Sequence, residues 1–275
     1  MSIKMEAQTD THKGLETAVK IVESIKKILA EDKKQKQPLF LKIKDDFIFK
    51  MARKAVQMKN RPLIIGIAGE SASGKTTFVH HTVNALIPKD REGIYTILPC
   101  DNYYHDMEQQ LKDLGSYDAL FATGFSFDTP DAINLALMKE HLLKLKNGEE
   151  IVCPDYDFVT CASNPNGEVK KPTKILLNEG LYVLNEGLRE IMDVKVYVFT
   201  PFDIIKDRWY KRAASRGKSG KAADIQFANV NETAQTYIRP ALEISDIVLN
   251  GVVSAEYIAE VTSKIYREIK AAVHS

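Results

Sequence analysis

The sequence predicts an α/β fold of the doubly wound type, in which a mainly parallel sheet is flanked by helices. Two patterns support this prediction. Short apolar runs rich in β-branched residues, typical of strands buried on both faces of a sheet, occur at residues 63–68, 94–98, 175–180 and 194–199. Amphipathic stretches with helical spacing lie between several of these runs and after the last of them.

The composition is that of an ordinary globular protein. With 275 residues and 44% hydrophobic content, the chain can bury a full core in one or two domains. Its net charge of +1 gives no global indication of a nucleic-acid or membrane partner. Cys100, Cys153 and Cys161 form no CxxC pair, which argues against a disulfide framework or a zinc site. There is neither an apolar signal core nor a run of ~18 apolar residues, so we expect a cytoplasmic protein.

Residues 1–60 precede the first predicted core strand. From Leu15 to Leu29 the apolar residues alternate by three and four, which predicts an amphipathic helix. Its apolar stripe either docks on the same chain or contacts a partner or a second copy, and the pattern leaves both open; we expect a homo-oligomer. A polar linker follows at 33–38, and a second amphipathic stretch runs from about Phe40 to Met58. We predict an N-terminal helical extension and linker at 1–60 and the main domain at 61–275.

One motif of this chain is highly specific. Residues 69–76, GESASGKT, fit the phosphate-binding pattern G-x-x-x-x-G-K-[ST] between the strand at 63–68 and a helical stretch at 77–87, which predicts a P-loop NTPase-type fold. Backbone N–H groups and a helix N-terminus there form an anion site. A chance glycine turn would need neither the strand before it nor the helix after it. We expect Lys75 to reach the β- and γ-phosphates of ATP and the Thr76 hydroxyl to bind Mg²⁺. The expected nucleotide-binding residues of this stretch are Gly69, Ser71, Ala72, Ser73, Gly74, Lys75, Thr76 and Thr77.

Two carboxylates follow predicted strands. Asp101 comes just after the strand at 94–98, and Glu179 lies at the end of the strand at 175–180. Ligands of open α/β sheets bind at the carboxyl ends of the strands. Asp101 can accept a proton from an attacking hydroxyl, bind Mg²⁺ or cap a loop, and beside a phosphate loop we favour a catalytic role. Glu179 is a second candidate ligand of Mg²⁺.

The middle of the chain is expected to cover this site. Residues 105–128 are predicted to form a loop, and Thr129-Pro130-Asp131 is a typical start for a helix that ends at Asn147-Gly148. The stretch 151–158 begins apolar and ends in aromatic and acidic residues, before a turn-rich segment at 163–167. Its aromatic side chains could stack on a planar ligand or fill a secondary core, and the spacing does not decide between them.

After a second typical helix start at 200–203, the sequence becomes basic. Arg208, Arg212 and Arg216 are four residues apart and would share one helix face. A glycine- and lysine-rich segment follows, so we predict a mobile lid over phosphates at about 208–226. A solvated basic helix end or a local nucleic-acid patch would leave a similar pattern. A helix around 229–243, a strand at 246–249 and an amphipathic C-terminal helix complete the chain.

Together these motifs resemble the uridine kinase and phosphoribulokinase family of P-loop kinases. The resemblance covers about residues 62–249 and rests on motifs in a fixed order: GESASGKTT, the DNYY that begins at Asp101, FSFDTPDA, PDYDF, NEG, and a basic segment that ends in SRGK. It implies a kinase that uses MgATP to phosphorylate a hydroxyl of a small molecule. No nucleic-acid or membrane partner is implied.

The resemblance also implies roles for single residues. Asp101 would be the general base, and Thr76, Asp101 and Glu179 would surround Mg²⁺. Asp128 matches the aspartate that holds the ribose hydroxyls in nucleoside kinases, and Arg208 matches an arginine that contacts substrate. The expected substrate-binding residues are Tyr104, Phe127, Asp128, Tyr156, Phe158 and Arg208. The expected catalytic residues are Asp101, Lys75, Lys211 and Arg216, with Lys218 as a further cation near the ATP phosphates.

The chain departs from the family pattern at the base-recognition motif. Uridine-cytidine kinases carry a histidine and an arginine where this chain has Cys161 and Ser163, and cysteine is a poor hydrogen-bond partner. The usual Arg-Asp pair of the lid is replaced by Lys211-Arg212. We expect a nucleoside such as uridine or cytidine as acceptor. The alternatives are another small alcohol or a sugar phosphate, and a nucleotide-dependent switch whose first 60 residues bind a partner.

Overall fold

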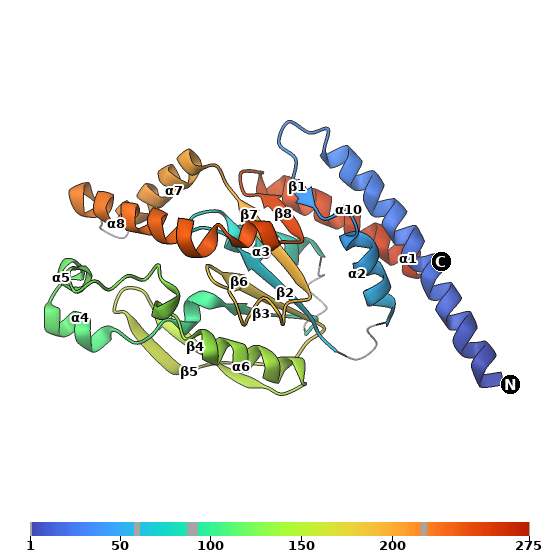
Figure 1. Ribbon diagram of the computed structural model, residues 1–275, viewed down its shortest axis with the longest axis horizontal. Helices are drawn as coiled ribbons and strands as arrows, with labels where there is room; N and C mark the ends of the chain where they lie inside the picture. The colour runs from blue at the N-terminus through green and yellow to red at the C-terminus, as the bar shows by residue number, and fades with distance from the viewer. Residues whose placement is uncertain (1, 58–60, 87–92, 216–218, 275) are drawn as a thin grey trace. The chain divides into compact units, whose positions relative to one another are not determined.

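The computed structural model describes residues 2–57, 61–86, 93–215 and 219–274 (Figure 1). They pack as two compact units. The terminal unit comprises Met1–Arg61, Thr77–Arg91 and Asp246–Ser275, and the sheet unit comprises Pro62–Thr76 and Glu92–Ser245. The functional boundary expected after residue 60 stays a prediction.

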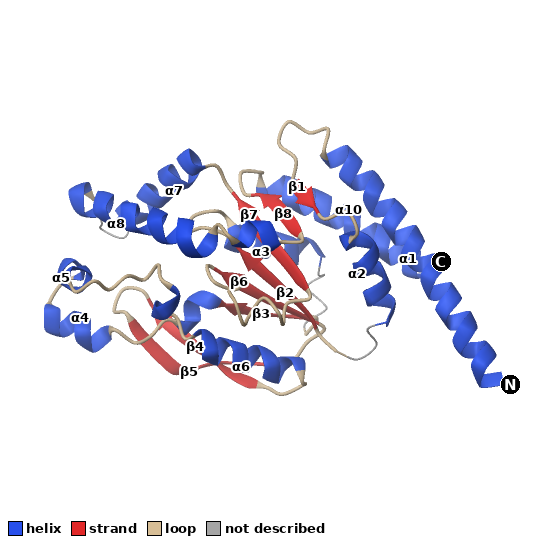
Figure 2. Cartoon of the chain, in the orientation of Figure 1, coloured by secondary structure: helices blue, strands red, loops and turns tan. Residues whose placement is uncertain are grey.

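The sheet unit is built on four parallel strands in the order β7-β2-β6-β3 (Figure 2). They are β2 (Leu63–Ala68), β3 (Tyr95–Pro99), β6 (Ile175–Gly180) and β7 (Val194–Phe199). The register pairs Ala68 with Gly180 and Pro99 with Glu179, so the carboxyl ends of β2, β3 and β6 meet at one edge. The apolar runs of the sequence thus correctly predicted a mainly parallel sheet.

Helices and a hairpin surround these strands. The core of the unit buries aliphatic and aromatic side chains from several elements, among them Leu98, Leu142 and Tyr182. The further elements are η1 (Cys100–Tyr103), α4 (Glu108–Leu114), α5 (Tyr117–Ala122), η2 (Pro130–Ala132), α6 (Leu135–Lys146), β4 (Ile151–Asp157), β5 (Ala162–Lys170), α7 (Phe202–Ser215), α8 (Gly220–Thr233), η3 (Ala234–Ile238) and α9 (Ala241–Ile244).

Two predictions for the middle of the chain were wrong in detail. The expected loop at 105–128 contains the short helices α4 and α5, and the Ser116 hydroxyl caps α5 by accepting the Ala119 N–H. Thr129 does not cap the long helix, because only the 3₁₀ turn η2 follows it. The cap of α6 is Asn134, whose side chain accepts the Leu137 N–H.

A further segment also differs from expectation. The turn-rich segment 163–167 lies inside β5, which pairs antiparallel with β4. A Cβ on Gly167 would lie 2.3 Å from the Cys153 carbonyl oxygen, so the glycine permits a close approach of the two strands rather than a turn. The segment predicted to be a lid, about 208–226, contains the end of α7 and the start of α8, and its role as a lid stays a prediction. Arg216 and Lys218 lie outside the described residues.

The described part of the terminal unit contains helices and a strand pair. The helices are α1 (Ser2–Asp32), α2 (Phe47–Gln57) and α10 (Ala255–His274), and most of α3 (Lys75–Leu86) also belongs to it. Strand β1 (Phe40–Ile43), which the sequence analysis missed, pairs antiparallel with β8 (Ile247–Asn250). The amphipathic stretch expected from Phe40 is therefore helical only from Phe47 onward.

The apolar stripe of α1 packs within its own unit. Ala18, Ile21 and Val22 are buried against Ala52 of α2, with Ile269 of α10 packed alongside. Of the two alternatives for this stripe, docking on the same chain is therefore observed.

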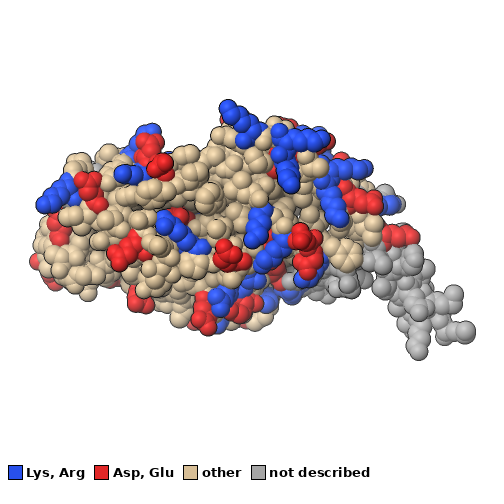
Figure 3. All heavy atoms as spheres, turned by 45° about the horizontal axis from the view of Figure 1, so that its top comes forward, with Lys and Arg blue, Asp and Glu red and all other residues tan. Residues whose placement is uncertain are grey.

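No described helix combines the length and the apolar character that a bilayer span requires. On the face drawn in Figure 3, lysine and arginine side chains lie among aspartate and glutamate side chains.

A buried carboxylate joins three segments of the terminal unit. Asp32, at the end of α1, is only 2% exposed. Its two oxygens accept hydrogen bonds from the Leu39 N–H at 2.8 Å, the Phe40 N–H at 2.9 Å and the Tyr257 hydroxyl at 2.7 Å. The carboxylate thereby connects α1, the start of β1 and α10.

Replacing this carboxylate should destabilise the fold. We expect Asp32→Ala to lower the free energy of unfolding by about 2 to 4 kcal/mol, because it leaves buried donors without an acceptor. Urea denaturation followed by circular dichroism measures the change. Glu31→Ala, at the exposed neighbouring position, is the control and should change it by less than about 0.5 kcal/mol. Equal effects of the two variants would contradict the anchoring role of Asp32.

Candidate active site

The phosphate loop joins β2 to α3 at the carboxyl edge of the sheet. A Cβ on Gly69 would lie 2.7 Å from the Val198 carbonyl oxygen, so the position accepts only glycine without rearrangement. Ala72 and Gly74 have φ angles of 65° and 98°, in the left-handed region. Backbone turns of this kind orient successive N–H groups into a concave anion site, which here ends at the N-terminus of α3.

Lys75 is the first residue of α3 and is only 9% exposed. Its Nζ donates a hydrogen bond to the Glu70 carbonyl oxygen at 3.0 Å. Burial lowers the pKa of the Lys75 ammonium, while the charges of Glu179 and Asp101 act in the opposite direction. The ammonium therefore lies against the loop and within electrostatic reach of both candidate carboxylates.

The candidate Mg²⁺ ligands come from the start of α3, the end of β6 and the turn that follows β3. The Thr76 hydroxyl donates a hydrogen bond to Glu179 Oε1 at 3.2 Å, so two of the three are in contact. Asp101 lies in η1, directly after β3. In the described part of the chain, no group of three or more His, Cys, Asp or Glu side chains could hold a metal by itself. These oxygen donors suit Mg²⁺, which usually takes one or two carboxylates and completes its shell with water and substrate phosphates.

The aromatic residues expected at the acceptor site form one cluster. The ring centroid of Tyr104 lies 5.7 Å from that of Phe127, 5.2 Å from Tyr156 and 5.6 Å from Phe158. Tyr104 and Tyr156 are buried, whereas Phe158 is 38% exposed. The two tyrosines therefore belong to the core of the sheet unit, and Phe158 is on the exposed side of the cluster.

Asp101 and Asp128 act on the same two tyrosines. Burial raises the pKa values of Tyr104 and Tyr182, and the charges of both aspartates raise them further. Asp101 is three residues before Tyr104, and Asp128 follows Phe127, whose ring centroid lies 5.7 Å from that of Tyr104. The Tyr182 hydroxyl, which sequence analysis did not single out, is buried and has no hydrogen-bond partner among the described residues.

Cys161 belongs to the same buried core as Tyr104 and Tyr156. It is 1% exposed, has a φ of 58°, and its Sγ lies 3.3 Å from the Tyr117 hydroxyl, to which it donates. The Tyr117 hydroxyl in turn donates to the Phe158 carbonyl oxygen at 2.8 Å. The Ser163 N–H donates to the Asp106 carboxylate at 3.2 Å. The buried thiol therefore contributes to packing at the position where uridine-cytidine kinases carry a histidine.

Helix α7 contacts the phosphate loop through two arginines. Arg208 Nη1 donates to the Ala72 carbonyl oxygen at 3.5 Å, and Arg212 Nη2 donates to the Ser71 hydroxyl. Lys211, expected to be catalytic, forms an exposed ion pair with Asp207 at 2.7 Å. The structure therefore brings Arg212 to the loop, and the spacing of four residues from Arg208 was the signal for it.

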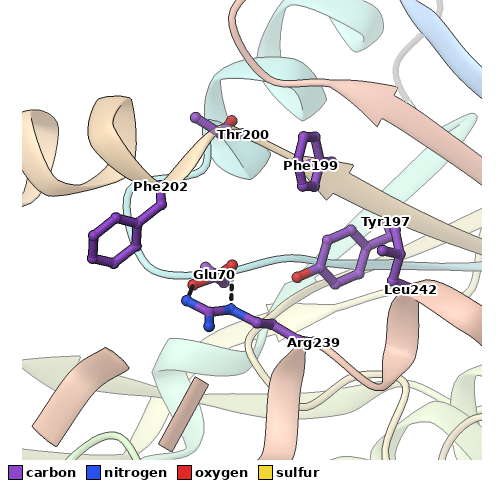
Figure 4. A pocket seen from close by; sticks show the side chains of 7 residues that line it. All are labelled: Glu70, Tyr197, Phe199, Thr200, Phe202, Arg239 and Leu242. Carbon is purple, nitrogen blue, oxygen red and sulfur yellow. Dashed lines mark hydrogen bonds and ion pairs between the residues drawn. The ribbon is translucent and has the colours of Figure 1, made fainter. Parts of the chain in front are cut away.

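Sequence analysis missed a partner of the loop. Arg239, which precedes α9, forms an ion pair with Glu70 at 3.0 Å. This pair lies at the edge of a pocket of about 300 Å³ (Figure 4). The other lining residues are Tyr197, Phe199, Thr200, Phe202 and Leu242. The two partners are 169 residues apart, and no local pattern links them.

Comparison with known proteins identifies the family. Residues 64–257 match the sequence model of the Phosphoribulokinase / Uridine kinase family. The chain belongs to this family. The uridine kinase of Lactobacillus helveticus is 34% identical over 197 residues, which cover 69% of this chain and 86% of that protein. The uridine kinase of Borreliella burgdorferi is 33% identical over 189 residues, which cover 68% and 85%.

A solved structure shares the fold. The structure of the YGR205w protein covers 74% of this chain and 90% of its own, with a TM-score of 0.51 and 18% identity. The family membership confirms the resemblance and the P-loop kinase fold class. It also confirms the enzyme class, a phosphotransferase of the uridine kinase type that acts on an alcohol group.

Gly180, at the end of β6, occupies a position that has no room for a side chain. A Cβ on Gly180 would lie 2.1 Å from the Cβ of Cys100, next to Asp101. We therefore expect Gly180→Ala to lower the free energy of unfolding by about 3 kcal/mol and to reduce kcat, because β6 or η1 must shift. Thermal melting and phosphoryl-transfer assays measure both. Gly115→Ala, which has a φ of 75° but nothing within 4 Å of a Cβ, should cost only about 1 kcal/mol and leave kcat unchanged.

Proposed function

We propose that the chain transfers the γ-phosphoryl group of MgATP to a hydroxyl of a nucleoside. The observation that carries this proposal is the convergence of the phosphate loop, the Thr76–Glu179 contact and Asp101 at one sheet edge. The aromatic cluster and Asp128 belong to the same unit. Together they supply a phosphate site, a metal site and an acceptor site.

Residues 69–77 would hold the ATP phosphates. Lys75 has three N–H donors, so it would keep its bond to the Glu70 carbonyl oxygen and bind the β- and γ-phosphates with the others. Thr76, Glu179 and Asp101 would hold Mg²⁺, which when bound neutralises charge on the transferring phosphoryl group. Arg208 and Arg212 already contact the loop and would add positive charge there. Lys211, Arg216 and Lys218 remain proposed cations of the lid.

Asp101 would orient the acceptor hydroxyl and accept its proton as the bond to phosphorus forms. In reactions of this type, positioning and charge neutralisation supply most of the rate enhancement. Asp128 would accept hydrogen bonds from the ribose hydroxyls, and Phe158 would border the base. The relatives named uridine kinases support a nucleoside acceptor.

A second acceptor class has support from one observation. The buried Cys161 is engaged with Tyr117, so it does not provide the base-reading group of uridine-cytidine kinases. Another small alcohol or a sugar phosphate is therefore the alternative acceptor.

Acceptor specificity can be tested directly. We expect ADP release from MgATP by the full chain to be stimulated by uridine or cytidine, and Asp101→Asn to lower kcat about a hundredfold or more while ATP still binds. Asp113→Asn, on the exposed surface of α4, is the matched control and should retain wild-type kcat. Stimulation only by a sugar or sugar phosphate would establish the alternative. ATP binding without any stimulated turnover would favour the nucleotide-dependent switch.

The role of Asp128 gives a separate prediction. Asp128→Asn should raise KM for the nucleoside at least about tenfold, because it removes a charged hydrogen-bond acceptor from the ribose site. KM for ATP should stay within about twofold, since Asp128 is not assigned to the phosphate site. Asp131→Asn, at an exposed position nearby, should change neither constant. Steady-state kinetics with each substrate varied in turn measures both KM values. A parallel rise in the two would refute this assignment.

A further inference from the structure

Glu70 lies within the phosphate loop, and its side chain is tied to a segment far along the chain. Its carboxylate accepts two hydrogen bonds from Arg239, from Nε to Oε1 at 3.1 Å and from Nη2 to Oε2 at 3.0 Å (Figure 4). The Glu70 side chain is 12% exposed and that of Arg239 is 35% exposed. A bidentate, partly buried pair of this kind holds both side chains in one geometry.

The backbone of Glu70 binds the loop and its lysine. The Glu70 carbonyl oxygen accepts the Ser73 N–H at 3.1 Å and Lys75 Nζ at 3.0 Å. The carboxylate that binds Arg239 and the carbonyl that binds Lys75 belong to the same residue. The guanidinium is therefore linked to the Lys75 ammonium through a single intervening residue.

Arg239 is itself fixed at two points. It follows the π-helical turn η3, where its backbone N–H donates to the Ala234 carbonyl oxygen at 2.8 Å. Its Nη2 also donates to Asn231 Oδ1 of α8 at 2.7 Å. Such π turns occur frequently at functional sites. Arg239 thereby connects the α8–η3 segment to the loop.

We propose that Glu70 and Arg239 form a positioning pair that holds the phosphate loop and Lys75 in the geometry that receives the nucleotide phosphates. The proposal rests on the proposed use of MgATP and deepens it. Neither side chain needs to touch the nucleotide, because the pair acts through the Glu70 backbone and Lys75.

A purely electrostatic role predicts the opposite effect at Glu70. The polyphosphate is anionic, so removing a nearby negative charge would tighten nucleotide binding if charge alone mattered. If the pair positions the loop, the same substitution weakens binding because the Glu70 backbone loses its anchor. The direction of the change in Glu70→Gln therefore distinguishes the two roles.

The test is titration calorimetry of the full chain with a non-hydrolysable MgATP analogue. We expect Glu70→Gln and Arg239→Gln each to weaken binding about tenfold, and the double variant to be no more than about twofold weaker than either, because contacting partners act as one unit. In a Lys75→Met background, Glu70→Gln should change the affinity less than about twofold. Arg189→Gln is the matched control: it breaks a pair with Glu190 at 2.9 Å, has a 39% exposed side chain, and should bind as the wild type does.

Kinetics separate positioning from general stability. KM for ATP should rise about tenfold in Glu70→Gln while KM for the acceptor stays unchanged, a split that loss of folded protein would not produce. If Arg239→Gln does not fold, Glu70→Gln alone carries the test. A wild-type chain that does not bind the analogue would overturn the proposed function. Wild-type binding with equal or tighter binding by Glu70→Gln would overturn only the positioning pair.

Discussion

The parallel register of β2, β3 and β6 is the constraint on which the candidate site depends. It places the ends of three strands at one edge, so that the phosphate loop, Glu179 and Asp101 leave the sheet side by side. The strands themselves are fixed by buried aliphatic residues such as Ile64 and Leu176, which have no chemical role. The polar groups are therefore positioned by packing, and their mutual contacts, such as that between Thr76 and Glu179, refine the arrangement.

The residues at the variable positions of the phosphate-loop motif contact other parts of the sheet unit. Glu70, Ser71 and Ala72 each meet a different partner, namely Arg239, Arg212 and Arg208. Ala72 also packs against the apolar cluster between α7 and α8. The fixed glycines and the lysine of the motif form the anion site, while the residues between them determine how that site is held.

Sequence patterns predicted the sheet strands and the phosphate loop, because a buried strand and a glycine-dependent turn both leave local signals. They failed where the signal is weak or distant. Helix α4 buries none of its residues, so it shows no apolar periodicity, and the mostly exposed β5 lacks the apolar run of a core strand. The spacing of Arg208 and Arg212 predicted a shared helix face and both reach the loop, whereas Lys211 faces Asp207. The Glu70–Arg239 pair joins residues that only the fold brings together.

The terminal unit is assembled from segments at both ends of the chain, and this affects how the protein is made. The hydroxyl that completes the Asp32 anchor belongs to Tyr257, 225 residues later. During synthesis α1 is made long before α10 and before β8, the partner of β1. Contacts of such long sequence separation form slowly and leave apolar surface open meanwhile. The part of the α1 stripe that packs on Ile269 therefore stays uncovered on the nascent chain until α10 has been made.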